Sequence, residues 1–191
     1  NLLTDMGYAP ETDEIGNVYA RRGARGGRLV MLAAHTDTVF PAQTDVSVRR
    51  DGGRLHGAGV GDNSLGVAAM LGTLAVLDRL AIETDVDIVA AATVGEEGLG
   101  DLRGIRAAVE RYRSDIAAVI AVEGHNFGRV THAGVGSTRW QVRVTGPGGH
   151  SWGAFGKPSA IHGLARIVST IAQIDVPADP KTTFNVRTIE G

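Results

Sequence analysis

Three apolar runs, each seven or eight residues long, constrain the fold of this chain most strongly. They are residues 28–34 (RLVMLAA), 87–94 (DIVAAATV) and 116–122 (IAAVIAV). Runs of this length are typical of strands, and strands that are apolar throughout are buried on both faces, as in parallel sheets. Helical patterns lie between them, apolar on nearly every side at residues 63–80 and amphipathic at residues 102–112. The sequence therefore predicts an α/β fold with a mostly parallel sheet flanked by helices.

From residue 136 the pattern changes to that of a smaller α+β unit. Residues 138–145 (TRWQVRVT) alternate between apolar and polar as a half-exposed antiparallel strand does, and residues 182–189 indicate a second strand. Residues 158–174 carry apolar side chains on one helical face. We therefore expect two domains, residues 1–135 and 136–191. Two strands and one helix are marginal as a domain, so we expect this chain to be a fragment of a longer protein.

Composition excludes several classes of partner. The chain has 19 Lys and Arg against 21 Asp and Glu, which argues against a nucleic-acid partner. One basic stretch, residues 21–28 (RRGARGGR), lacks the aromatics of an RNA-binding arm, and we expect an exposed hairpin loop there. The chain has no cysteine, so disulfides and thiolate chemistry are excluded. Apolar runs too short for a bilayer and an N-terminus unlike a secretory signal favour a cytoplasmic protein with no membrane partner.

Each apolar run is followed closely by side chains that can bind a metal ion. These are His35 after the first run, Glu96 and Glu97 after the second, and Glu123 after the third. Ligand sites in open α/β sheets form at the carboxyl ends of the strands. Imidazole and carboxylate donors without thiolates suit Zn, Mn or Co. Asp62, at the start of the apolar helix, adds a fourth group whose charge the helix dipole favours, although an N-cap is the alternative interpretation.

Two further carboxylates have interpretations beside this cluster. Asp37, two residues after His35, is spaced to accept the second N–H of a metal-bound imidazole, and a turn-capping aspartate is the alternative. The adjacent Glu96 and Glu97 can divide two tasks, one binding a metal ion while the other holds a water. Two ions about 4 Å apart lower the pKa of such a water toward ~7 and polarise a carbonyl. This chemistry indicates hydrolysis of an amide bond.

Four motifs in this order, HTDTVF, GAGVGDNSLGV, GEEGLGDLRG and AVEG, resemble a known zinc-dependent family. It comprises carboxypeptidases, aminoacylases, acetylornithine deacetylases, succinyl-diaminopimelate desuccinylases and peptidase T. GPGGHSWG and TTFNVRTIEG resemble the inserted lid or dimerisation domain of that family. The resemblance covers nearly the whole chain and implies a partial catalytic domain followed by the first half of the lid.

The resemblance also implies a set of metal ligands. His35 and Glu123 would bind one zinc ion, Glu97 would bind a second, and Asp62 would bridge the two, with Co or Mn as alternative metals. Position 123 is Glu where many relatives have Asp. The last ligand of the family, a histidine near the C-terminus of the complete protein, is absent from this chain. We therefore expect the fragment alone to be inactive.

The remaining roles follow from the same resemblance. Glu96 would be the general base, Asp37 the orienting carboxylate, and His150 the lid histidine that helps to polarise the substrate carbonyl. The implied enzyme is a metallopeptidase or amidohydrolase that acts on small peptides or N-acyl amino acids and forms a homodimer through the lid. A peptidase T-like aminopeptidase is the first expectation, and an N-acyl-amino-acid deacylase is the alternative.

Three rival hypotheses come from other features of the sequence. GHSWG at residues 149–153 matches the nucleophile motif of serine hydrolases, with Ser151 as the nucleophile, but lacks the strand–turn–helix context. GAGVGD at residues 57–62 imitates a dinucleotide-binding loop, although Asp62 would repel a pyrophosphate. A non-enzymatic binding or dimerisation module of the same fold is the third. His125 lies two residues from Glu123 and is expected to be a supporting or solvated histidine rather than a ligand.

Overall fold

The computed structural model describes residues 2–124 and 127–190. The chain divides into two compact units, Asn1–Gly134 and Val135–Gly191. The division falls one residue before the boundary that the change in sequence pattern suggests. Each unit is described by itself below.

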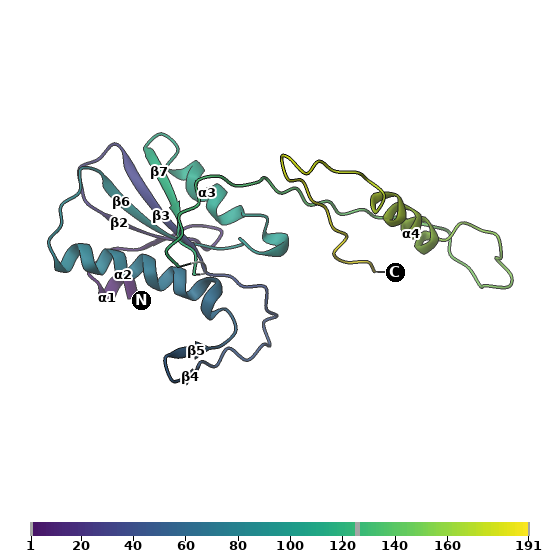
Figure 1. Cartoon of the computed structure of the whole chain (residues 1–191), viewed down its shortest axis with the longest axis horizontal. Helices are drawn as coiled ribbons and strands as arrows, with labels where there is room; N and C mark the ends of the chain where they lie inside the picture. Colours follow the sequence, from purple (N-terminus) through teal and green to yellow (C-terminus); the bar gives the residue numbers. More distant parts are fainter. Residues whose placement is uncertain (1, 125–126, 191) are drawn as a thin grey trace. The chain divides into compact units, whose positions relative to one another are not determined.

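The first unit is built on a five-stranded mixed sheet with the strand order β1-β2-β6-β3-β7 (Figure 1). The three apolar runs form its parallel part, as predicted: β3 (Leu29–His35) lies between β6 (Asp87–Thr93) and β7 (Ile116–Ala121). Beyond β6, β2 (Val18–Arg22) pairs antiparallel with it, and β1 (Glu11–Thr12) pairs antiparallel with β2. These two strands were not expected from the apolar pattern, because they are short and partly polar.

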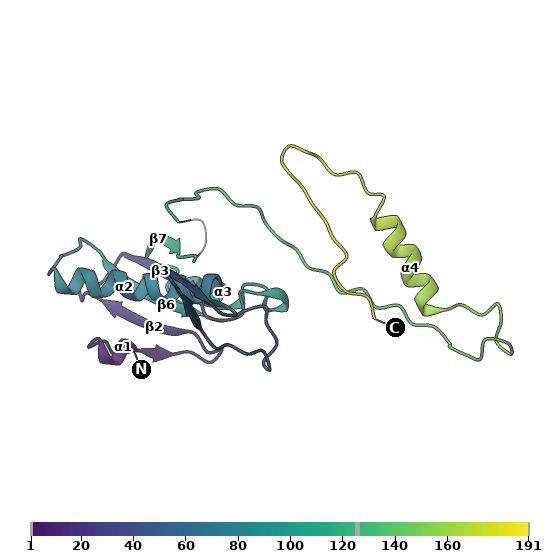
Figure 2. The same cartoon turned by 60° about the horizontal axis from the view of Figure 1, so that its bottom comes forward.

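Helices cover both faces of the sheet (Figures 1 and 2). On one face α2 (Leu65–Arg79) and the short α1 (Leu2–Asp5) join a core cluster with alternate strand residues; its buried members are Leu3, Ala20, Leu32, Ala34, Met70, Leu74, Ile88 and Ala90. On the other face α3 (Arg103–Arg111) packs on the intervening residues; the buried members there are Tyr19, Leu29, Met31, Ala33, Val89, Ala91 and Ala108. The alternation of strand residues between the two clusters explains why these strands are apolar throughout.

The prediction that the third run is a buried strand is wrong for this chain. Among the described residues β7 lies at the edge of the sheet and pairs with β3 alone, and Val119 and Ile120 are 40% and 51% exposed. The helix at 63–80 is likewise buried on one side only, because a helix that lies on a sheet hides a single stripe of side chains. Met70 and Leu74 are buried, whereas Val76 on the outer side is 46% exposed.

By length and composition alone, Val60–Arg79 is also apolar enough to cross a membrane. In the structure its C-terminal part, α2, packs on the sheet through Met70 and Leu74. Its beginning is not regular helix, because Asp62 and Asn63 have non-helical backbone angles. These features are those of a helix in the core of a domain, which can be as long and as apolar as a membrane-spanning helix.

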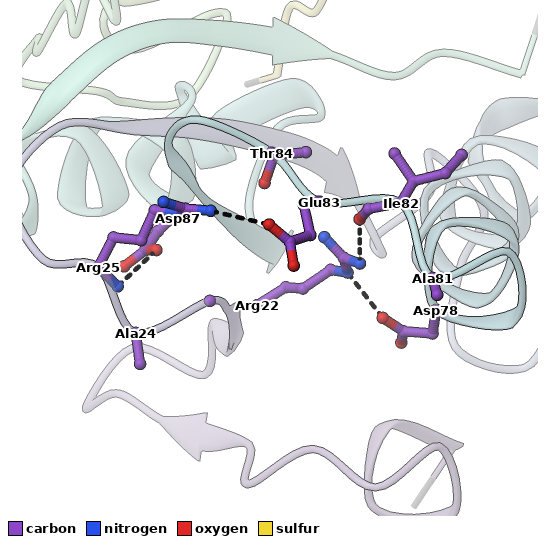
Figure 3. Close-up of a pocket in the computed structure, with 10 residues that line it drawn as sticks. Arg22, Ala24, Arg25, Asp78, Ala81, Ile82, Glu83, Thr84 and Asp87 are labelled. Carbon is purple, nitrogen blue, oxygen red and sulfur yellow. Dashed lines mark hydrogen bonds and ion pairs between the residues drawn. The ribbon is translucent and has the colours of Figure 1, made fainter.

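The basic stretch 21–28 is a connection between strands, but the expected hairpin is wrong. β2 and β3 do not pair, because β6 lies between them. The stretch is fixed by Asp87, whose buried carboxylate accepts hydrogen bonds from the Arg21 side chain and from the backbone N–H groups of Arg25 and Gly26. Figure 3 shows the pocket beside this carboxylate. There the backbone N–H of Arg25 donates to Asp87, and the guanidinium of Arg25 donates to Glu83.

A two-stranded hairpin stands apart from the main sheet. It consists of β4 (Arg49–Asp51) and β5 (Arg54–His56), which are joined by a short turn, and all six strand residues are exposed. The hairpin lies in the chain between His35 and Asp62. The connection from β3 to α2 therefore carries two of the candidate ligands at its two ends.

Among the described residues of the second unit, the predicted helix is the one regular element that forms. α4 spans Ala160–Ile171, and Ser159 is its N-cap, because its hydroxyl accepts a hydrogen bond from the N–H of His162. The expected strands at 138–145 and 182–189 are wrong: both segments are without strand pairing in the described residues. Apolar–polar alternation indicates which face of a strand would be buried, but a strand exists only when a neighbour takes up its backbone hydrogen bonds.

Candidate metal centre

The parallel strands end at one edge of the sheet and bring the predicted donors together. His35 is the last residue of β3 and lies opposite Thr93, the last residue of β6. Glu96 and Glu97 follow β6 within the loop to α3, and Glu123 follows β7 by two residues. The candidate site therefore has donors from three adjacent strand ends.

The imidazole of His35 lies at the middle of this group and is 4% exposed. Its Nε2 atom lies 3.0 Å from Oδ1 of Asp62 and 3.7 Å from Oε2 of Glu123. Its Nδ1 atom lies 3.0 Å from the carbonyl oxygen of Asp37. Because a carbonyl only accepts, Nδ1 carries the hydrogen, and Nε2 then faces two carboxylates. A proton or a cation between Nε2 and these carboxylates is needed to avoid repulsion between lone pairs.

The carboxylate of Asp37 has a different partner from the one expected. It lies 3.8 Å from Nδ1 of His35, so the backbone carbonyl of Asp37 rather than its side chain orients the ring. Its two oxygens instead accept hydrogen bonds from the backbone N–H groups of Glu96 at 3.1 Å and Glu97 at 3.0 Å. Asp37 therefore connects the histidine to the loop that carries both glutamates.

Asp62 is not the N-cap of the apolar helix. The helix begins at Leu65, and Asp62 lies in the irregular turn before it. The neighbouring Asn63, which is 1% exposed, accepts a hydrogen bond from the N–H of Gly66 and donates one to the carbonyl of Val122. Asn63 thus ties the start of the helix to the segment just before Glu123, and it leaves the Asp62 carboxylate free of the capping role.

The sequence analysis did not single out Asn63. A signal was present, because Asn is a preferred residue at the start of a helix and stands two residues before Leu65. Its second contact, to Val122, is 59 residues away in the sequence and has no local signature. The approach there is close: a Cβ on Gly66 would lie 2.4 Å from the carbonyl oxygen of Val122, so only glycine fits.

Two groups of side chains place their ligand atoms close enough to share an ion. One is His35, Asp62 and Glu123, and the other is His35, Glu96 and Glu97; the ligand atoms of each group lie within 4.8 Å of one another. An imidazole with several carboxylates is a donor set suited to Zn, Mn or Co. The residues therefore fit a metal ion. In the part of the chain that the structure describes, Asp62 and Glu97 do not belong to one such group.

The crowding of negative charge appears in the pKa values of the site. Burial raises the pKa of Glu97, and the neighbouring carboxylate of Glu96 raises it further. Burial alone would lower the pKa of His35, but the Asp37 carbonyl and the carboxylate of Glu123 outweigh it, so the pKa is raised. Both raised pKa values favour the protonated form of the side chain, and therefore favour additional positive charge at the site.

The remaining candidates lie outside this group or outside the described residues. His150 belongs to the second unit, where its Nδ1 accepts a hydrogen bond from the N–H of Trp152 at 3.2 Å. Ser151 is exposed in a turn, and the next helix begins only at Ala160. The strand–turn–helix geometry of a serine nucleophile is absent from this described segment. The expectation for His125 lies outside the described residues.

Comparisons with known proteins give a consistent result. The sequence profile described as peptidase family M20/M25/M40 matches residues 31–187. Succinyl-diaminopimelate desuccinylase of Corynebacterium glutamicum is 32% identical over 157 residues, which is 82% of this chain and 42% of that protein. The enzyme of the same name from Methylorubrum extorquens is 41% identical over 96 residues, 47% of this chain and 25% of that protein. This chain therefore spans less than half the length of these relatives.

Among solved structures, the aminopeptidase PepT of Bacillus cereus superposes with a TM-score of 0.51 at 24% identity. The match covers 64% of this chain and 35% of that one. This likeness supports the α/β fold with a mixed sheet flanked by helices.

Proposed function

Because the chain belongs to peptidase family M20/M25/M40, we propose that it carries most of the metal centre of a hydrolase that cleaves an amide bond. The observation that supports this most directly is the convergence of one buried imidazole and four carboxylates, from three strand ends and from the turn before α2. In this proposal His35, Asp62 and Glu123 hold one zinc ion, and Asp62 and Glu97 contribute to the position of a second.

Metal ions held there would polarise the scissile carbonyl and lower the pKa of a water molecule. The residues of this chain would do the rest. His35 presents Nε2 to the ligand position because Nδ1 is tied to the Asp37 carbonyl. Glu96 would hold the attacking water and take its proton, and later pass that proton to the leaving nitrogen.

The division of work between the glutamates is compatible with how they are held. Both backbone N–H groups donate to the two oxygens of Asp37. The backbone of the pair is therefore fixed while the two side chains remain half-buried at the site. A carboxylate that binds a metal ion directly cannot also act as the base, so two adjacent carboxylates serve the proposed reaction better than one.

The substrate class is the finer part of the proposal. The two desuccinylase relatives favour removal of an acyl group from an N-acyl amino acid. The peptidase T-like aminopeptidase expected from the motifs has only a likeness of fold beside it, and it is the second candidate. Both reactions break an amide bond and need the same metal-binding residues.

The proposal is tested on the intact protein by removing and restoring metal. A strong chelator should abolish hydrolysis of N-succinyl and N-acetyl amino acids or of tripeptides, and Zn, Co or Mn should restore it. The substrate panel separates the two candidates, because only one class should be turned over well. Full activity after exhaustive metal removal, or stoichiometric inactivation by a reagent that modifies Ser151, would contradict the metal hypothesis.

We also propose that Val135–Gly191 is part of a lid through which two copies associate. Its large aromatic side chains Trp140, Trp152 and Phe155 are 85%, 89% and 92% exposed, and such apolar exposure is typical of an interaction surface. Because Nδ1 of His150 is an acceptor in the structure, its Nε2 carries the hydrogen and can donate to a substrate carbonyl. His150→Ala should lower kcat without changing the dimer seen by sedimentation, whereas monomeric protein would contradict the proposed association.

A further inference from the structure

The loop that carries Glu96 and Glu97 has little regular structure of its own. It runs from the end of β6 to the start of α3 and has left-handed backbone angles at Gly95, Gly98, Asp101 and Leu102. Apart from one short 3₁₀ turn, its geometry depends on contacts with other parts of the chain. Asp37 supplies the contact at the glutamates themselves. Asp37 does not bind the two ends of the loop, which are held by a different residue.

That anchor is Asn17, which lies between β1 and β2 and is 0% exposed. Its Oδ1 accepts a hydrogen bond from the N–H of Val94 at 3.0 Å, where the loop begins. Its Nδ2 donates to the carbonyl of Gly104 at 3.1 Å, where the helix after the loop begins. One amide side chain therefore binds both ends of a segment that lies 77 and 87 residues away in the sequence.

Asn17 is itself held in place by a buried polar cluster. Its backbone N–H donates to Oδ1 of Asp13 at 2.8 Å, and the two hydrogens of its Nδ2 are shared among the Gly104 carbonyl, Oδ2 of Asp13 at 2.9 Å and the hydroxyl of Tyr19 at 2.9 Å. The Tyr19 hydroxyl in turn donates to Asp13. Since each partner is engaged, the orientation of the amide is fixed, with its oxygen toward Val94.

The two loop ends also approach each other closely. A Cβ on Gly104 would lie 2.2 Å from the carbonyl oxygen of Val94 and 2.8 Å from Oδ1 of Asn17. No side chain larger than that of glycine fits there without moving the loop end or the asparagine. The loop is therefore closed at its base by one amide and one glycine.

We propose that Asn17 is a positioning residue for the Glu96–Glu97 loop. Its side chain bonds to none of the candidate metal ligands, and it acts by fixing the two residues from which the loop departs. Displacement of a reacting group by about 1 Å can cost on the order of 100-fold in rate. Val94, which Asn17 holds, lies two residues before Glu96. Loss of this bond would therefore shift the proposed general base. The part of this inference that concerns turnover rests on the proposed function, whereas the part that concerns the loop does not.

The experiment compares Asn17→Ala with Tyr19→Phe in the intact, zinc-loaded protein. Both substitutions remove hydrogen bonds from the same buried cluster, but only the first removes the bonds to Val94 and Gly104. Hydrogen exchange is read at the N–H groups of Glu96 and Glu97, whose acceptor, Asp37, is unchanged in both variants. Zinc affinity is measured by competition with a chelator, and kcat and KM are measured separately.

We expect Asn17→Ala to speed exchange at both glutamate amides, to weaken the Glu97-dependent zinc position and to lower kcat. The losses should be about 10- to 100-fold, with KM within about twofold, since substrate contacts are untouched. Tyr19→Phe leaves Asn17 its bonds to Asp13, Val94 and Gly104, so it should change each of these quantities much less than Asn17→Ala does, even if it lowers the unfolding free energy. Equal exchange at Glu96 and Glu97 in the two variants would overturn the proposal.

A second pair of variants covers the case in which Asn17→Ala does not fold. Gly104→Ala disturbs the same anchor from the helix side, whereas Gly72→Ala adds a methyl group to α2 where nothing lies within 4 Å. Faster exchange in Gly104→Ala alone supports the anchor, and unchanged exchange in both overturns it. If the wild-type protein hydrolyses no amide, the proposed function fails, while the exchange data still decide whether Asn17 holds the loop.

Discussion

At the scale of single residues, the backbone carbonyl and the carboxylate of Asp37 bind two different parts of the site. Its carbonyl accepts a hydrogen bond from the His35 ring, and its carboxylate accepts two from the glutamate loop. Burial alone would raise the pKa of Asp37, but the N–H groups of Glu97 and Glu96 outweigh it and lower the pKa. Asp37 is therefore ionised at neutral pH, and both of its oxygens are available as acceptors.

Asp37→Asn tests this arrangement. An amide places an NH2 group against one of the two backbone N–H donors, so one anchoring bond is replaced by a repulsive contact. We expect zinc affinity, measured by chelator competition, to fall about 10- to 100-fold. Asp45→Asn is the control, because Asp45 lies in the same connection, is exposed, and accepts its bonds from Ser47. Equal affinity in both variants would show that the carboxylate does not hold the site.

The paired glutamates give a second prediction at this scale. Glu96→Gln keeps the shape of the side chain and its backbone bond to Asp37 but removes the proton acceptor. We expect turnover to fall by about 10²- to 10⁴-fold while zinc content stays nearly intact. Glu97→Gln should lower the zinc content as well. Zinc is counted by mass spectrometry on both purified variants, and equal zinc loss in the two would contradict the division of roles.

At the scale of elements, the edge of the sheet opposite the candidate site depends on Asp87. This carboxylate is the first residue of β6 and accepts hydrogen bonds from the Arg21 side chain and from two backbone N–H groups of the 21–28 connection. Burial raises the pKa of Asp87, but these bonds, first that from the N–H of Arg25, lower it below its ordinary value of 3.8. A carboxylate with a lowered pKa stabilises the fold when it is ionised.

Asp87→Asn should therefore destabilise the protein in a pH-dependent way. At neutral pH the variant leaves a buried donor poorly paired, and we expect a loss of about 1–3 kcal/mol in the unfolding free energy. The difference from wild type should shrink as pH falls below 3.8, because the unfolded chain then binds a proton that the native carboxylate takes up only at lower pH. Urea unfolding at several pH values measures this, with the exposed Asp85→Asn as the control. A difference that is constant with pH would contradict the ionised role.

The elements also show where sequence patterns succeed and where they do not. The apolar runs located β3, β6 and β7 because hydrophobicity over seven residues is a local property. The same pattern gave the wrong burial for β7, since an edge position depends on which strands pair. The segment 138–145 has the alternation of a strand and forms none, because pairing is a property of two segments rather than one.

At the scale of the whole molecule, the first domain supplies one metal position more completely than the other. His35, Asp62 and Glu123 lie close enough together to offer three donors to the first, whereas the proposed ligand set gives the second only Asp62 and Glu97. A catalytic zinc ion generally has three protein ligands. We expect the 191-residue chain by itself to bind at most one equivalent of zinc firmly, to lose it on His35→Ala, and to hydrolyse no amide. Two tightly held ions with activity, found by mass spectrometry and assay, would contradict the ligand set.

The sequence by itself determined the three parallel strands and the family, and it predicted the candidate donors that follow these strands. These follow from local composition and from the direction of the chain, because parallel strands must end at one edge. Only the tertiary structure decided how the donors are held. The contacts of Asp37 to the glutamate loop and of Asn17 to Val94 join residues 59 and 77 positions apart. No local pattern encodes such pairs, since a buried amide or carboxylate finds its partners only once the sheet has brought the loops together.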